Sequence, residues 1–318
     1  MNLPGRTANA MAYHLKSDES VPEGIKRVAS EEMESAAAQL TGKGEPDRDE
    51  AIHEARKSIK KTRAVLKLMR DELGETYNAE NARLRDAGRD LSRFRDAGAI
   101  IGTFDSLVEK YRLDLKDQSL ESIRHGLQAK KQESEQQGQI DRVLKRRAAT
   151  LRQVGKRVKA WRLDTDGFPA LAPGLENTYR RGKQAMAQAQ KHPRPENYHE
   201  WRKRVKDLWY HVRLLEYVWT DVMQAYEKAL KELETWLGDD HNLIVLRDQV
   251  MAEPEFYGKE QDVARLLQLM DKYHKELRDN ACSVGERIYE EKPRQFSRRM
   301  QHTWDSWQAQ PKTLEAAS

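Results

Sequence analysis

The chain of 318 residues is poor in cross-linking residues and in residues that interrupt helices. Its one cysteine, Cys282, excludes an intrachain disulfide and therefore a disulfide-stabilised scaffold. The 17 glycines and 10 prolines are few for this length, which favours long helices and argues against a β-sandwich. No apolar run approaches the roughly 18 residues that a membrane span needs, so we expect no membrane span.

The opening residues also lack the apolar stretch of a secretory signal peptide. Together with the single cysteine, this predicts a reducing, cytoplasmic setting. Hydrophobic residues make up 38% of the chain, which is enough for one large core or two smaller ones. A disordered chain is therefore excluded.

Acidic residues are missing from several long stretches, although the whole chain carries a net charge of only +5. Residues 55–70 contain seven basic side chains and no acidic one, and residues 142–162 contain nine and none. Arg180, Arg181 and Lys183 form a further basic group. An ordinary solvated helix face usually mixes both signs, with Glu and Lys four residues apart. The separation of charge therefore favours a surface that binds a polyanion.

Apolar residues recur at intervals of three and four almost everywhere, which is the period of amphipathic helices. The pattern breaks at short polar stretches, at 41–49, 163–174, 191–197 and 253–260. We therefore predict an all-α protein. Within it we expect two helical bundles, at 8–162 and 175–310, joined by a linker at 163–174.

The two halves of the chain also resemble each other. The segment AIHEARKSIKKTRAVLKLM is answered by NYHEWRKRVKDLWYHVRLL at an offset of 146, since 199 − 53 = 146 for the two histidines. The identical pairs are His53 and His199, Glu54 and Glu200, Arg56 and Arg202, Lys57 and Lys203, Lys60 and Lys206, and Leu68 and Leu214. The register continues without a gap to Leu84 with Leu230 and Leu91 with Leu237. We interpret this similarity as an internal duplication.

A helical wheel separates a basic stripe from an apolar arc in each copy. The first stripe consists of Arg56, Lys60, Arg63, Lys67 and Arg70, and its arc of Ala55, Ile59, Thr62, Val65, Leu66, Met69 and Leu73. The second stripe consists of His199, Arg202, Lys206 and Arg213, and its arc of Val205, Leu208, Val212, Leu215 and Trp219. Trp209 interrupts the second stripe, where it could cover the stems of its neighbours. We expect Trp161, Trp201, Trp209, Tyr210 and Trp219 to lie in the core.

Several kinds of site are not predicted. No glycine-rich phosphate loop is present, and no HExxH motif occurs. Neither His53 nor His199 has a second His or Cys three or four residues away, so we predict no metal site and no cofactor. Each histidine is either structural or a donor that gains a proton when an anion binds. In the second case, affinity should rise as the pH falls through the histidine range near 6.5.

The ordered set of motifs resembles the CHAD family, the conserved histidine α-helical domain. The segments are HEARKSIKKTR, HEWRKRVKDLWY, LSRFRDAGAIIGTF, LGDDHNLIVLRD, YRRGKQA at 179–185 and EKPRQFSRRM at 291–300. The resemblance covers about residues 8–310. It implies two pseudo-symmetric four-helix bundles with a basic central cleft, and non-catalytic binding of inorganic polyphosphate. An association with polyphosphate or other storage granules would follow.

The resemblance implies ligand contacts at the motif positions His53, Arg56, Lys57, Lys60, Arg63, His199, Arg202, Lys203 and Lys206. The charge pattern adds Lys67, Arg213, Arg152, Lys156, Arg180, Arg181 and Lys183 as further candidates. Trp209 stands where the first copy has a basic residue, and His241 with Asn242 replaces the pair Arg95 and Asp96. Because of these departures, the sequence does not predict that the two halves are equivalent. Residues 1–50 are too short for the triphosphate-tunnel domain of some family members, so its hydrolase activity is not expected.

Two other functions stay open beside polyphosphate binding. A phosphohydrolase with His53 or His199 as general acid would need carboxylates to hold magnesium, and the basic stripes offer none. A helical protein that binds the phosphate backbone of nucleic acid is supported by charge alone. A linear phosphate chain across several stripes fits the pattern best, with affinity that grows with chain length and falls with salt. The sequence does not predict an oligomeric state.

Overall fold

The computed structural model describes residues 13–42, 48–92, 96–111, 117–134 and 137–310. These residues form α-helices and a short 3-10 helix, and no strand occurs among them, so the predicted all-α fold is confirmed. The first half contains α1 (Val21–Gln39), α2 (Arg48–Leu68), α3 (Arg70–Leu73), α4 (Glu75–Ser92), α5 (Asp96–Lys110), α6 (Asp117–Ser134) and α7 (Gln137–Val158). The second half contains α8 (Phe168–Lys191), α9 (Pro195–Leu214), η3 (Glu216–Val218), α10 (Thr220–Ala252), α11 (Pro254–Tyr257), α12 (Glu260–Ile288) and α13 (Pro293–Gln308).

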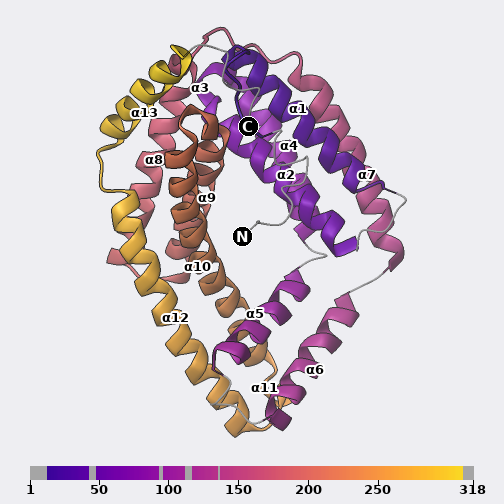
Figure 1. Cartoon of the computed structure of the whole chain (residues 1–318). Coiled ribbons are helices and arrows are strands. Elements are labelled where there is room, and N and C mark those ends of the chain that lie inside the picture. The colour runs from indigo at the N-terminus through magenta and orange to yellow at the C-terminus, as the bar shows by residue number, and fades with distance from the viewer. Residues whose placement is uncertain (1–12, 43–47, 93–95, 112–116, 135–136, 311–318) are drawn as a thin grey trace, which may run out of the picture.

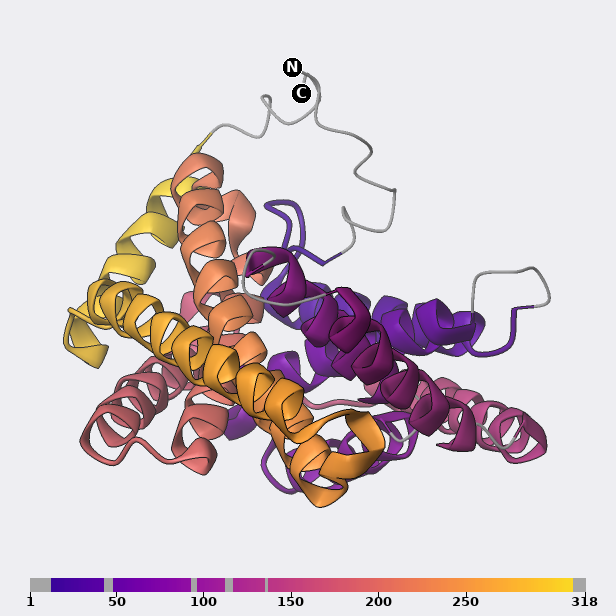
Figure 2. The same ribbon diagram turned by 90° about the horizontal axis from the view of Figure 1, so that it is seen from below.

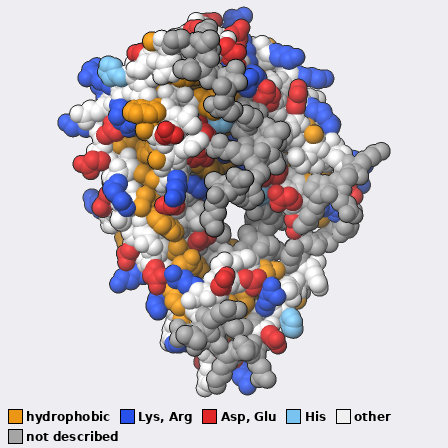
Figure 3. Space-filling model, in the orientation of Figure 1, with side chains coloured by type: hydrophobic (Ala, Val, Ile, Leu, Met, Phe, Trp, Pro, Cys, Tyr) orange, Lys and Arg blue, Asp and Glu red, His pale blue; other side chains and the backbone are white. Residues whose placement is uncertain are grey.

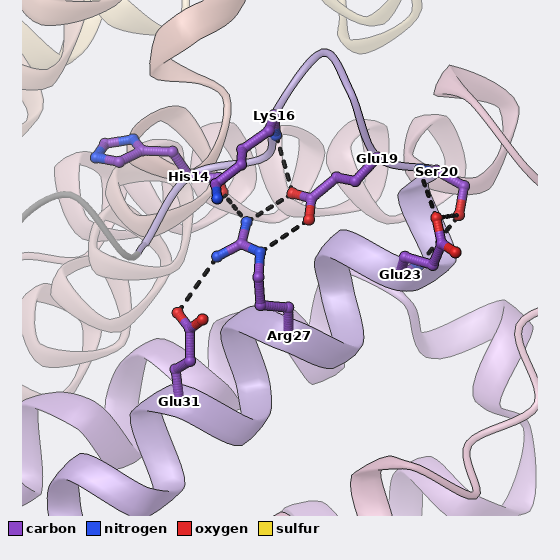
Figure 4. A network of polar contacts seen from close by, with 7 residues as sticks. All are labelled: His14, Lys16, Glu19, Ser20, Glu23, Arg27 and Glu31. Carbon is purple, nitrogen blue, oxygen red and sulfur yellow. Dashed lines mark hydrogen bonds and ion pairs between the residues drawn. The ribbon is translucent and has the colours of Figure 1, made fainter.

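A polar network fixes the start of α1 (Figure 4). Arg27 donates to both carboxylate oxygens of Glu19, at 2.6 and 2.8 Å, and to the carbonyl oxygen of His14 at 2.6 Å. Ser20 caps the helix, because its hydroxyl accepts from the backbone N–H of Glu23 while the Glu23 carboxylate accepts from the N–H of Ser20. α1 then packs along α2.

The predicted linker at 163–174 is only partly a loop. Gly167 has a φ of 68°, which glycine adopts without strain, and α8 begins at Phe168 immediately after it. Pro169 lies in the first turn, where the N–H that proline lacks has no intrahelical partner to lose. Residues 168–174 are therefore helical, with Pro173 inside α8, and the sequence prediction of a loop there is wrong.

Two hydrophobic cores hold the helices together. The first joins α1, α2, α4 and α7 to α8, α9, α13 and the adjoining ends of α10 and α12. The second joins α5, α6 and α11 to the remaining parts of α10 and α12, and it forms the lower arm in Figure 1. α10 has 33 residues and α12 has 29, so each is long enough to enter both cores. The predicted bundles at 8–162 and 175–310 therefore share their cores, and their two-fold relation stays a prediction.

Helices α2 and α9, which carry the repeated segments, pack against each other. All seven residues of the apolar arc predicted for α2 are buried, as are Val205, Leu208, Val212 and Leu215 of α9. Trp161, Trp201, Trp209 and Tyr210 are buried as predicted. Trp219 is 57% exposed, because α9 ends at Leu214 and the chain turns through η3, so the helical register does not extend that far. The prediction that Trp219 lies in the core is therefore wrong.

Figures 2 and 3 show the outer shape of the molecule. Seen from below, α12 runs across the front (Figure 2). In the space-filling view, which has the orientation of Figure 1, basic and acidic side chains are intermixed on the visible face (Figure 3). None of the helices in the described ranges is both long and apolar enough to cross a membrane.

Candidate anion-binding site

Basic side chains of the two copies meet where α2, α9 and α10 pack together. On α9, Arg202 and Lys206 form ion pairs with Glu234 of α10, at 3.0 and 2.7 Å. Lys231, one turn before Glu234, binds its other carboxylate oxygen at 2.9 Å. Lys60 of α2 lies close enough to Lys206 and Arg202 for each of them to lower its pKa. We call Lys60, Arg202, Lys206, Lys231 and Glu234 the junction cluster.

The Glu234 carboxylate is ionised and buried, with 4% of its side chain exposed. Burial acts to raise its pKa, but Lys206, Arg202 and Lys231 outweigh this effect, so the pKa lies below its usual range. A second carboxyl, Asp239, lies near Arg202, and burial raises the pKa of that group. Glu234 is therefore the fixed counter-ion of the cluster.

Lys60 is the basic residue of the junction cluster that forms no ion pair. Its ammonium is half-buried and has no hydrogen bond or ion pair among the residues that the structure describes. Burial, followed by repulsion from Lys206, Arg56 and Arg202, lowers its pKa to about 6. The repeat explains the missing partner, because the offset of 146 places Gly88 in the first copy where the second has Glu234. Lys206 thus forms an ion pair with an acid, whereas Glu234 acts on Lys60 only from a distance and raises its pKa less than burial and the three cations lower it.

Lys57 and Lys203 are placed alike in the two copies. Lys57 bonds Glu54 at 3.1 Å and Lys203 bonds Glu200 at 3.3 Å, each one turn back on its own helix. Both lysines are exposed enough for these ion pairs to contribute less than about 1 kcal/mol. A bound anion could therefore draw either lysine away at little cost.

Three further stripe residues are committed to contacts between helices. Arg63 donates to the Asn81 amide oxygen at 3.0 Å, and Lys67 of α2 donates to Asp207 of α9 at 2.5 Å. Arg213 pairs with Glu227 at 3.0 Å. The charges of these three residues already help to hold the helices together.

Trp209 lies beside the charged ends of two basic neighbours. The Lys231 ammonium lies 4.9 Å from the centre of its ring, and the Arg213 guanidinium lies 5.6 Å away. Both distances are within the range of a cation–π contact. The indole therefore orients two cations at the edge of the cluster in place of the basic residue of the first copy.

The two histidines begin the stripes without forming a pair with each other. His199 is half-buried, and its ring centre lies 4.3 Å from that of His241. Burial, with help from His241 and Lys203, lowers its pKa to about 4, so the imidazole is neutral at physiological pH. His53 Nε2 lies 3.9 Å from Glu54 Oε1. Without ligand, His199 therefore does not titrate near pH 6.5, and protonation of the histidines on anion binding stays a prediction.

The other predicted candidates lie outside the junction cluster. Arg152 and Lys156 are exposed on α7, which packs on α1 and α4 at the outer edge of Figure 1. Arg180 donates to Asn177 on its own helix, and Lys183 donates to the carbonyl oxygens of Glu290 and Glu291 beyond α12. Arg181 is exposed and lines a recess with Lys67.

Sequence reasoning missed the acids that organise these cations, Glu234 and Asp207. Both stand among ordinary mixed charges in the sequence, and the spacing of Lys231 and Glu234 is typical of any solvated helix. Only the packing of α9 against α10 and α2 gives the two acids their role. The duplication offered one signal, because Glu234 aligns with a glycine.

These features define a class: an all-α protein whose repeated basic helices meet at a buried counter-ion. The model of the CHAD domain family matches residues 31–250, so the chain belongs to the CHAD family and the predicted resemblance is confirmed. Among solved structures, it is similar to the crystal structure of the CHAD domain from the plant Ricinus communis. The two share 17% identity with a TM-score of 0.53, over 92% of this chain and 95% of that chain, which shows the fold alone. A search of curated proteins found no match.

Proposed function

We propose that this protein binds inorganic polyphosphate without transforming it, in the cytoplasm and in association with polyphosphate granules. The observation that carries the proposal is the charge balance of the junction cluster. Lys60, Arg202, Lys206 and Lys231 have one ion-paired carboxylate among them, and Lys60 has no partner in the described part of the chain. A phosphate unit beside Lys60 would supply the negative charge that the cluster lacks.

Each residue type has a distinct part in holding such a chain. Arg202 can offer a fork of donors to phosphate oxygens, whereas Lys60 and Lys206 act as point charges. Negative charge beside Lys60 raises its pKa, so the ligand restores the proton that burial disfavours. Counter-ions released from the phosphate chain add a favourable entropy that weakens as salt rises.

Nucleic-acid binding through the phosphate backbone is the alternative. Lys60 is half-buried at a junction of helices, and a thin, flexible phosphate chain reaches such a position more easily than a duplex does. Duplex DNA is stiff over about 150 base pairs and presents its phosphates on a wide cylinder. Competition between long polyphosphate and duplex DNA at fixed salt separates the two proposals, because duplex DNA that displaces polyphosphate at equal phosphate concentration would favour the alternative.

Hydrolysis would make different demands on the site. It needs carboxylates that can hold magnesium or an activated nucleophile. Two acids that lie beside the stripes, Glu234 and Asp207, are already paired with lysine or arginine. Incubation with polyphosphate and magnesium, followed by gel analysis of chain length, tests this part. Shortening that tracks the purified protein would overturn binding without turnover.

Charge reversal tests the site itself. Lys60→Glu with Lys206→Glu should abolish binding of long polyphosphate, because each lost charge-assisted contact is worth about 1.5 to 3 kcal/mol and each new carboxylate repels the ligand. Either change alone should weaken binding by about tenfold to a hundredfold. The control is Arg294→Glu with Arg298→Glu, an equal charge change at two exposed sites on α13. A folded double variant of Lys60 and Lys206 with wild-type affinity would place the contact surface elsewhere.

A further inference from the structure

A second group of basic side chains lines a narrow recess between α2, α8 and α9. The lining residues are Lys67, Arg70, Tyr77, Asn177, Thr178, Arg181, Arg204 and Asp207. Lys67 follows Lys60 by about two helical turns, or about 10 Å along α2, so the recess lies at one end of the first stripe. Four of its eight lining residues are cations and one is an acid.

Close packing of α8 on α2 creates this recess. A Cβ atom at Gly174 would lie 1.9 Å from the carbonyl oxygen of Leu68, so only glycine lets the helices approach so closely. Asn177, Thr178 and Arg181 follow Gly174 at helical spacing and share its face of α8. The approach at Gly174 therefore brings them to the end of α2.

The charges of the recess are only partly compensated. Asp207 is buried, and it pairs with Lys67 at 2.5 Å and with Arg204 at 3.3 Å. Arg204 also pairs with Glu200 at 2.8 Å. Arg70 and Arg181 are exposed and have no acidic partner among the described residues, although the Arg70 guanidinium lies 5.0 Å from the centre of the Tyr77 ring. Two guanidinium groups are thus available at the mouth of the recess.

We propose that this recess is a second anion site, which takes a single phosphate group. An inner unit of a phosphate chain carries one negative charge, whereas a terminal phosphate group or orthophosphate carries about 1.5 to 2 around neutral pH. Converging cations beside the Thr178 hydroxyl and the Asn177 amide suit such a compact dianion, while the open stripe suits a linear chain. The recess holds either orthophosphate or the end of a chain, and only the second form rests on the proposed function.

Titration with orthophosphate tests the recess directly. Arg70→Gln with Arg181→Gln should weaken orthophosphate binding by about tenfold or more, since two guanidinium donors are lost. Both residues are exposed, so the melting temperature should stay near that of the wild type. Arg294→Gln with Arg298→Gln serves as the control and should change nothing. Lys60→Glu with Lys206→Glu should leave orthophosphate binding in place, which separates the recess from the junction cluster.

Polyphosphate with free ends and polyphosphate with esterified ends distinguish the two sources of the phosphate group. If the recess takes a chain end, the double arginine variant loses affinity for free-ended chains and keeps its affinity for capped chains. If it takes orthophosphate alone, both chains bind the variant as they bind the wild type. A folded variant that matches the wild type for orthophosphate and for both chains overturns the proposal. Failure of every long chain to bind the wild type would reject the proposed function while the orthophosphate titration still decides on the recess.

Discussion

Replacing Glu234 with glutamine removes the counter-ion of the junction cluster and keeps the shape of its side chain. The change leaves Arg202, Lys206 and Lys231 without their shared carboxylate, beside a Lys60 that already has none. Two opposite effects follow. The unliganded fold should lose stability, and the affinity for polyphosphate should rise, because the ligand no longer shares the cations with an internal acid.

The two effects differ in size. Removal of one partner from a buried ion pair costs about 3 to 5 kcal/mol. Half of the Lys231 side chain is exposed, so solvent screens its part, and the loss comes mainly from Arg202 and Lys206. Two donors released towards the ligand should tighten binding by at least about tenfold, or about 1.4 kcal/mol. Saturating polyphosphate should therefore stabilise the variant by about 1.4 kcal/mol more than it stabilises the wild type.

Urea unfolding with and without polyphosphate measures the first effect, and calorimetric titration measures the second. Glu232→Gln is the matched control, because it removes the same charge from an exposed position two residues away on α10. The control should leave stability and affinity within about 0.5 kcal/mol of the wild type. A folded Glu234→Gln variant that binds polyphosphate no more tightly than the wild type would refute the reasoning. Glu234 would then order the cations for the ligand, and it would not compete with the ligand.

Four further predictions concern protons and the missing acid of the first copy. Lys60 should take up a proton when polyphosphate binds at about pH 7 to 8, since its pKa is about 6 without ligand; titrations in buffers of different ionisation enthalpy measure this uptake, and Lys60→Gln should abolish it. Because the folded pKa lies below the usual 10.5, the unliganded protein should gain stability as the pH rises from about 6 towards 10.5, and urea unfolding of Lys60→Gln should lack this gain. Gly88→Glu should give Lys60 a partner, strengthen the unliganded fold and weaken polyphosphate binding; unchanged affinity in calorimetry would contradict it. His199→Gln should not alter the dependence of affinity on pH between about 5.5 and 8, because His199 with a pKa of about 4 stays neutral there, and a lost step in that range would show otherwise.

The sequence was sufficient for the parts of the fold that depend on local periodicity. The apolar arc of α2, including Ile59, Val65 and Leu66, is buried because a single helix decides which side chains share a face. The prediction that Trp219 is buried was wrong for the same reason. A helical wheel is valid only as far as the helix continues, and α9 ends at Leu214. The sharing of cores between halves depends on the lengths of α10 and α12 and on which helices they meet, and no local pattern encodes that.

The candidate site likewise contains residues that local sequence patterns identify and residues that only the packing of helices reveals. Lys60 and Lys206 could be selected from the sequence, because like charge on one helical face is a local property. The placement of Arg152 and Lys156 away from the junction could not, because a basic face on α7 looks the same whether that helix is central or peripheral. Buried acids are the hardest case, since Glu234 is recognisable as a counter-ion only after α9 and α10 have been packed together.

The unequal counter-ions give the duplicated segments different tasks. In the second copy, Glu234 compensates Lys206 and Arg202, so those cations add to the stability of the unliganded fold. In the first copy, the aligned position is Gly88, and burial of Lys60 without a partner costs stability in the absence of ligand. A protein that carried Glu at both positions would be more stable and would attract a polyanion less. A protein that carried glycine at both positions would have no carboxylate there to offset the repulsion between the basic side chains of the junction cluster. One copy with an ion-paired carboxylate and one copy without it hold the helices together, and they leave at Lys60 an amine that gains a proton when an anion from outside binds beside it.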